Sequence, residues 1–217
     1  MARYVALLRG INVGGKNLIP MASLKACFEE HGYEDVRTYI HSGNVVFSSA
    51  LSNRAELTRR VEQMLGMTFD HYDASVVLLR RSQIRAIVDR APKGFGTQPA
   101  RYRYDVIFLK APLTPRVAIK DVPTKEGVDR AWAGTGVLYF SRLTSRASQS
   151  RLSRVVSMPI YKSMTIRNWT TTTKLLELLE TESKAEPVEV RAQPMTEDGS
   201  QLPPDTSTQT RSPGAGE

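Results

Sequence analysis

Three segments of the chain carry residue types that could bind or transform a ligand. In the first, residues 9–17, a short apolar strand passes into a loop that interleaves glycines with basic and amide side chains. Glycine lets a backbone approach a ligand closely, and freed N–H groups beside cations favour an anion. The loop therefore predicts an anion cradle. Its members would be Arg9, Gly10, Asn12, Gly14, Gly15 and Lys16.

The loop also has a purely structural interpretation, in which glycine serves only to turn a strand into a helix. Neither common nucleotide-binding motif fits its spacing. Gly10 and Gly15 are placed as in a phosphate loop, but Asn17 follows Lys16 where Ser or Thr would bind magnesium. The GxGxxG pattern of dinucleotide-binding domains is absent as well.

The second segment, residues 38–44, reads TYIHSGN. Strand alternation places Tyr39 and His41 on one face. A tyrosine on a sheet surface can stack a base, and histidine titrates near neutral pH, so these two are weak candidates for catalysis. Ser42 and Asn44 are candidates for ligand binding. The alternative is a hairpin turn capped by Asn44, because no paired carboxylate or nucleophile stands beside His41 in the sequence.

The third segment, residues 161–175, contains four consecutive threonines. Threonine is a poor helix former, so a helix that begins with four of them indicates a use for the hydroxyls. The segment predicts a second anion-binding helix start, with Thr165 or Asn168 as the cap. Its ligands would be Arg167, Asn168, Thr170 and Lys174. The alternative is capping alone, with Trp169 anchored in the core.

The charge distribution favours an acidic partner. The chain carries +8 overall; three basic and six acidic side chains lie from residue 183 on, so residues 1–182 carry +11. Between residues 130 and 176 there are eight basic residues and no acidic one, which predicts one basic surface around the third segment. These residues are Arg130, Arg142, Arg146, Arg151, Arg154, Lys162, Arg167 and Lys174.

Several function classes are disfavoured by composition. No apolar run approaches the roughly 20 residues of a membrane helix, and the N-terminus lacks the pattern of a signal peptide. The lone Cys27 has no disulfide partner within the chain, which fits a reducing cytoplasm. The three histidines share no ligand spacing, so no metal is expected. No GxSxG elbow points to a serine nucleophile, and no cofactor is expected.

The elements that must position these segments follow from apolar periodicity. In the first third, strands are expected at 4–8, 36–41, 45–48 and 74–79, with helices at 20–31 and 52–65 between them. This β-α-β-β-α-β order is ferredoxin-like. The second half predicts a decayed repeat, with strands at 105–109, 127–133 and 137–141 and helices at 82–90, 114–119, 148–156 and 168–179.

The expected architecture is therefore α+β, with two ferredoxin-like lobes. The first lobe would cover residues 1–80, and the second, with a C-terminal helix, residues 81–182. Residues 183–217 are rich in Pro, Ser, Thr, Gly and Glu and are expected to form a disordered acidic tail.

The motifs together resemble the domain of unknown function 1697 family of bacterial proteins. The matching pieces are YVALLRGINVGGKNLIPMASL, YEDVRTYIHSGNVVFSS and YKSMTIRNWTTTTKLLEL, and the resemblance covers about residues 1–180. It implies an intracellular bacterial protein with a duplicated ferredoxin-like fold, and it brings no catalytic assignment or substrate.

The leading functional hypothesis is a cytoplasmic protein that binds a nucleic acid or a phosphate-bearing nucleotide in a site shared by the first and third segments. One alternative is a small-molecule enzyme, a transferase or hydrolase acting on a phosphorylated metabolite. In that enzyme Arg9, Lys16 and Arg167 would hold phosphate and His41 or Tyr39 would move a proton. A further alternative is a non-catalytic protein-interaction module. The sequence leaves the oligomeric state open.

Overall fold

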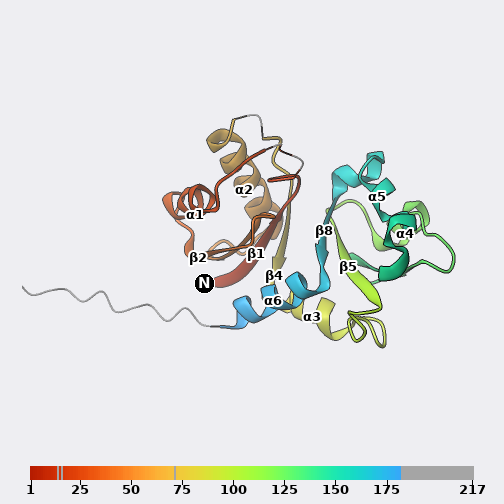
Figure 1. Cartoon of the computed structure of the whole chain (residues 1–217). Coiled ribbons are helices and arrows are strands. Elements are labelled where there is room, and N and C mark those ends of the chain that lie inside the picture. The colour runs from red at the N-terminus through yellow and green to blue at the C-terminus, as the bar shows by residue number, and fades with distance from the viewer. Residues whose placement is uncertain (14, 16, 71, 182–217) are drawn as a thin grey trace, which may run out of the picture. The chain divides into compact units, whose positions relative to one another are not determined.

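Two four-stranded antiparallel sheets form the framework of the chain (Figure 1). The structure is a computed structural model that describes residues 1–13, 15, 17–70 and 72–181. Gly14, Lys16 and the predicted tail at 183–217 lie outside the described residues. Residues 1–183 cluster as one compact unit, so a division into separate domains at residue 80 stays a prediction.

The first sheet has the strand order β2-β3-β1-β4. Its elements are β1 (Ala2–Leu8), α1 (Met21–Glu30), β2 (Glu34–Tyr39), β3 (Asn44–Ser49), α2 (Arg54–Thr68) and β4 (Val76–Arg80), followed by α3 (Arg81–Asp89). Strand β1 pairs antiparallel with both β3 and β4. This is the predicted ferredoxin-like arrangement.

The second sheet repeats that order as β6-β7-β5-β8. Its elements are β5 (Tyr102–Leu109), α4 (Pro115–Asp121), β6 (Asp129–Ala133), β7 (Val137–Leu143), α5 (Leu152–Val155), β8 (Met164–Asn168) and α6 (Trp169–Glu180). Two 3-10 helices, Thr144–Gln149 and Pro159–Ser163, flank α5. In each half a helix follows the last strand, so α3 and α6 correspond, and the predicted repeat is confirmed at the level of topology.

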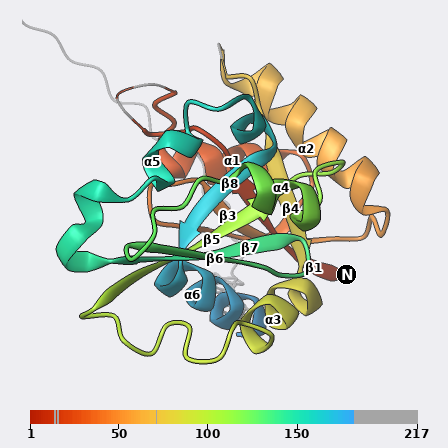
Figure 2. The same ribbon diagram turned by 90° about the vertical axis from the view of Figure 1, so that its right-hand side faces the viewer.

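Each sheet buries both faces, which explains the continuous apolar runs of its central strands. One face of the first sheet packs on α1 and α2 through residues such as Tyr4 and Phe28. One face of the second sheet packs on α4 and α5 through Ile107 and Leu152. The remaining faces share a third apolar cluster with α3 and α6, which lie side by side (Figure 2).

The structure corrects the sequence-based expectations in two places. Residues 164–168 form the edge strand β8, where we expected only the approach to a helix. The helix expected at 148–156 is a 3-10 turn followed by the four residues of α5. In the first case a strand only five residues long, with Arg167 near its end, carries too weak a periodicity to be recognised.

Candidate functional site

Two asparagines anchor the described residues of the loop at 9–17. Asn12 Nδ2 donates to Ile19 O at 3.0 Å and to His41 O at 2.9 Å, while Asn12 Oδ1 accepts from Ile19 N at 2.8 Å. Asn17 Nδ2 donates to Gly10 O at 2.8 Å. Both asparagines have left-handed φ values of 54° and 48°, which this residue type tolerates. These amides therefore hold the loop and the neighbouring β2–β3 turn together.

The β2–β3 turn packs closely against the same loop. Gly43 has φ +74°, and a Cβ there would lie 2.7 Å from Ile11 Cδ1. Asn44 Nδ2 donates to Tyr39 O at 2.9 Å and to Ser42 Oγ at 3.1 Å. Only glycine satisfies both the backbone angle and the contact at position 43.

Tyr39 and His41, the two candidates for proton transfer, do not share a face at this turn. Strand β2 ends at Tyr39, and the next residue, Ile40, has φ 48°, so the alternation that we expected stops there. Tyr39 is partly buried against the apolar cluster shared by the sheets, whereas His41 is exposed. The structure thus places the two rings in different environments.

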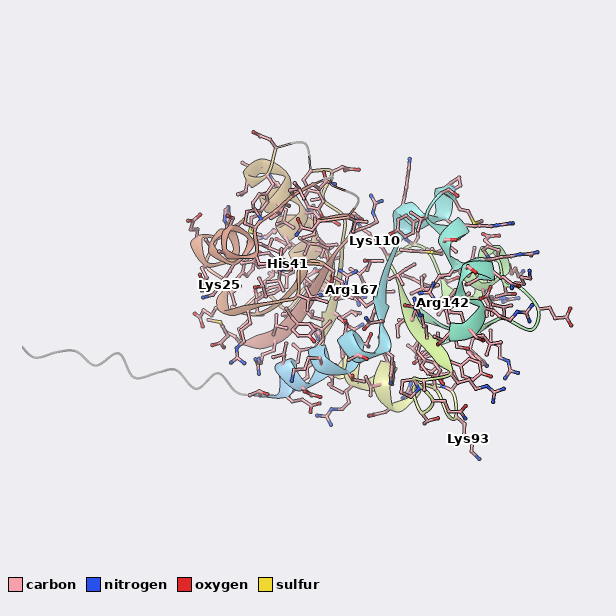
Figure 3. The ribbon with its side chains drawn as sticks, viewed as in Figure 1. Lys25, His41, Lys93, Lys110, Arg142 and Arg167 are labelled. Atoms are coloured by element: carbon pink, nitrogen blue, oxygen red, sulfur yellow. The ribbon has the colours of Figure 1, made fainter. Side chains whose placement is uncertain are left out.

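Arg167 joins the two lobes from the edge strand β8 (Figure 3). Its Nε donates to Asn44 Oδ1 at 2.6 Å, and its Nη2 donates to Leu8 O and Ser42 O, each at 2.8 Å. Nη1 donates to Thr165 Oγ1 at 2.9 Å and to Ile166 O at 2.8 Å. Arg167 of the third segment therefore binds the second segment and Leu8, the residue before the first segment, while Asn12 joins the first segment to the second.

All of the donors of this guanidinium are used within the protein. The side chain is 7% exposed, and burial is the main cause that lowers its pKa to about 10, so it remains charged at neutral pH. Its oxygen partners are carbonyl, amide and hydroxyl groups, and none of the ion pairs among the described residues includes it. Arg167 is therefore placed to position the loops rather than to contact a ligand.

The start of α6 also uses its polar groups internally. Asn168 caps the helix, since its Oδ1 accepts from Thr171 N at 2.7 Å. The hydroxyls of Thr172 and Thr173 donate to carbonyls of the preceding turn, a bond that suits threonine within a helix. Lys174 Nζ lies 2.7 Å from Glu177 Oε2. Thr170 is exposed and is the hydroxyl of this run that stays accessible.

The basic residues of 130–176 do not form one surface, which corrects our expectation. In the register of the second sheet Arg130 pairs with Ser141, and Asp129 pairs with Arg142, so Arg130 and Arg142 lie on opposite faces. Arg142 forms an ion pair with Asp105 at 3.2 Å. Arg167 is buried between the lobes.

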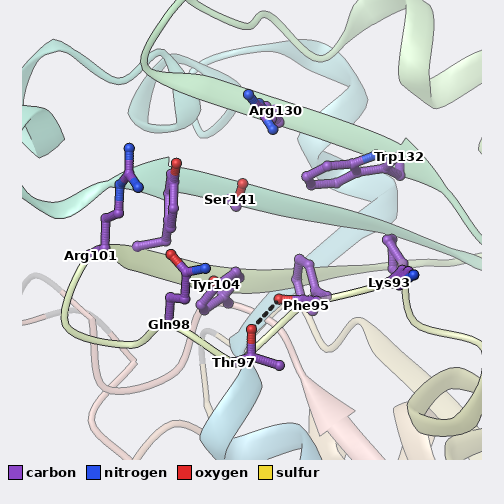
Figure 4. A pocket seen from close by; sticks show the side chains of 12 residues that line it. Lys93, Phe95, Thr97, Gln98, Arg101, Tyr104, Arg130, Trp132 and Ser141 are labelled. Atoms are coloured by element: carbon purple, nitrogen blue, oxygen red, sulfur yellow. Dashed lines mark hydrogen bonds between the residues drawn. The ribbon is translucent and has the colours of Figure 1, made fainter.

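An aromatic pocket of about 250 Å³ lies elsewhere, where the loop after α3 crosses the second sheet (Figure 4). The ring of Phe95 anchors this loop to the second sheet and to α6. It makes edge-on contacts with the rings of Tyr104, at 4.8 Å between centroids, and Trp169, at 5.2 Å. The pocket is lined by Pro92, Lys93, Gly94, Phe95, Thr97, Gln98, Arg101, Tyr102, Tyr104, Arg130, Trp132 and Ser141.

Strand register explains how the pocket combines rings with cations. Tyr104 of β5 pairs with Ser141 of β7, which pairs with Arg130 of β6, so these three side chains form a row across one face. Tyr102 lies two residues before Tyr104 on the same face, and Arg101 Cζ is 5.3 Å from its ring centroid. Three cations and no carboxylate line the pocket. The arrangement offers partly exposed ring faces within a positive field.

Sequence reasoning did not single out this pocket. The pattern Arg101-Tyr102-Arg103-Tyr104 could have indicated it, since alternation on a strand puts both tyrosines on one face. Trp132 of β6 lies 28 residues after Tyr104, and only the fold shows that the three rings line one pocket.

Within the described part of the chain no group of three or more His, Cys, Asp or Glu side chains is placed to hold a metal ion. No helix in that part is long and apolar enough to cross a membrane.

The comparisons with known proteins give a family and a structural neighbour. A family model described as a protein of unknown function (DUF1697) matches residues 1–139. A solved structure of a conserved bacterial protein from Streptococcus pneumoniae is similar, with 29% identity and a TM-score of 0.72. The similarity covers 82% of this chain and 98% of the neighbour. No curated protein matches.

Proposed function

Because the chain belongs to the DUF1697 family of proteins of unknown function, we propose a function from its own geometry: it binds single-stranded nucleic acid at the aromatic pocket. The observation that carries this proposal is the lining of that pocket. Partly exposed tyrosine and tryptophan rings stand beside Lys93, Arg101 and Arg130, with no carboxylate among the lining residues. Rings stack bases and cations neutralise phosphates, and single strands offer both together.

The size of the pocket supports a single base rather than a whole cofactor. Its volume of about 250 Å³ lies below the roughly 300–1,000 Å³ of most small-molecule sites. A planar base stacked on Tyr102 or Tyr104 would leave its sugar and phosphate toward Arg130, which lies two strands across the sheet. Bases flanking it would remain outside the pocket, so the proposal predicts binding with little sequence preference.

Binding of labelled oligonucleotides tests the proposal. With fluorescence anisotropy on single-stranded RNA and DNA, we expect Tyr102→Leu to weaken binding by about 5- to 150-fold, the loss expected for about 1–3 kcal/mol of stacking. Tyr102 is chosen because Tyr104 also supports Phe95. If three cations neutralise three phosphates, the logarithm of the association constant should fall with a slope of about −2 against the logarithm of salt concentration.

The chain offers a matched control for charge. Arg130→Gln removes a cation from the pocket and should reduce the salt slope by about 0.7. Arg103→Gln removes an exposed cation from the opposite face of the sheet and should leave both the affinity and the slope unchanged. Equal losses in the two arginine variants, or no saturable binding of any single strand, would contradict the proposal.

A further inference from the structure

A second hollow, the β4 groove, shares no residue with the aromatic pocket. It encloses about 900 Å³ along strand β4, and all of residues 76–79 line it. One wall comes from α2 and α3, and the other from the connection between β5 and α4 with the turn at Thr135 and Gly136. Its length along four strand residues is about 13 Å.

Strand β4 has no neighbouring strand on the side that faces this groove. It is the outermost strand of its sheet and pairs only with β1. Arg9 N donates to Ser75 O at 2.9 Å, and in an antiparallel ladder the bonded pairs alternate, so Val77 and Leu79 face β1. The N–H and C=O of Leu78 therefore point outward. Val76 N donates to Glu62 Oε1 at 2.7 Å, so it also points away from β1, as this alternation requires.

The side chains of the groove are mainly apolar, with cations at its rim. Val77, Leu79, Ile87, Leu109 and Leu113 supply apolar surface from four different elements or connections. Arg54 and Arg59 are exposed at the α2 side of the groove. The one carboxylate in the lining, that of Glu62, already accepts from Lys110 Nζ and Val76 N. The groove therefore keeps a net positive rim without a free carboxylate.

We propose that the β4 groove binds an extended peptide that adds a strand to β4 and carries apolar and acidic side chains in alternation. The outward backbone groups of Leu78 would pair with the peptide backbone, which gives affinity to any extended chain. The apolar side chains of the peptide would fill the groove between β4 and the β5–α4 connection. Its acidic side chains would reach Arg54 and Arg59, which select the peptide by charge. This proposal is independent of the nucleic-acid site.

The test uses the full chain and a set of labelled short peptides in which valine or leucine alternates with aspartate or glutamate. We expect saturable binding in fluorescence anisotropy. The Leu78 amide should become protected against hydrogen exchange, as followed by NMR. The same peptide with N-methyl groups on its strand-pairing amides should lose binding at least about tenfold, because it can no longer donate to β4.

Two chain variants separate the contributions. Arg59→Glu should weaken binding about tenfold, while Arg154→Glu, an exposed reversal on α5 outside the groove, should not. Protein stability, measured by urea unfolding, should be equal in the two variants. The proposal is overturned if no peptide of the set binds below about 1 mM, or if N-methylation has no effect. Occupation of the groove by a second copy, seen as dimers whose interface protects Leu78, would also overturn it.

Discussion

Removing the guanidinium of Arg167 should loosen the connection between the two lobes. Arg167→Ala deletes six hydrogen bonds, four of which reach Leu8, Ser42, Gly43 and Asn44 in the first lobe. No apolar side chain could replace these bonds, because each acceptor is a carbonyl, amide or hydroxyl oxygen. The expected result is a large loss of stability from a residue that touches no predicted ligand.

The magnitude follows from the acceptors left behind. An orphaned buried acceptor costs about 1–3 kcal/mol, and Asn44 Oδ1 and Leu8 O lose their donor together, which gives about 2–6 kcal/mol. Part of this is offset, because a buried guanidinium without a carboxylate partner is itself costly to desolvate. We therefore expect the free energy of unfolding to fall by about 2–4 kcal/mol.

Urea unfolding followed by tryptophan fluorescence measures this loss, since Trp132 and Trp169 both lie in the second lobe. Arg154→Ala, an exposed arginine, is the control and should change stability by less than about 0.5 kcal/mol. A double-mutant cycle with Asn44→Ala should give a coupling energy of about 1.5–3 kcal/mol, the range for a hydrogen bond to a charged group. A loss for Arg167→Ala no larger than the control, or a coupling energy near zero, would refute the reasoning.

Two other perturbations test the packing and the electrostatics. Gly43→Ala should lower the free energy of unfolding by about 2–4 kcal/mol, because it adds strain at φ +74° to a 2.7 Å clash with Ile11. In the same unfolding assay Gly10→Ala should lower it by about 1 kcal/mol, because a Cβ there meets nothing within 4 Å. Burial raises the pKa of Asp105 above its ordinary 3.8, so the unfolded chain releases this proton first and stability should fall as pH rises from 3.8 to the raised pKa. Asp105→Asn should abolish this fall in urea midpoints measured between those pH values, and an unchanged pH profile would contradict the assignment.

Local signals in the sequence predicted much of the fold. The apolar run at 4–8 and the cap at Asn168, one of the two cap candidates, depend on neighbours within four residues, and the structure shows both. Strand β8 was missed because its partner β5 lies about 60 residues earlier, and five residues carry little periodicity of their own.

The structural role of Arg167 could not be predicted from the sequence, because it depends on partners that lie far away along the chain. Its partners Asn44 and Leu8 lie 123 and 159 residues away, so an arginine before a threonine-rich helix was interpreted as an anion ligand. The aromatic pocket was missed for a related reason. Alternation places Tyr102 and Tyr104 on one face, but the sequence does not tell which end of that face remains uncovered by α3 and α6.

The first strand and the last helix are bound to each other. Arg3 on β1 donates to the carbonyls of Leu178 and Leu179 at 3.1 and 2.9 Å, which satisfies the C-terminal end of α6 with a positive charge. These partners are 175 and 176 residues apart. During synthesis at about 5–20 residues per second, β1 therefore leaves the ribosome roughly 10–35 s before α6 can cover it. Until then α3 covers Val5 and Leu7 only in part, so the first lobe depends on α6, the helix after the last strand of the second sheet, to complete the burial of β1.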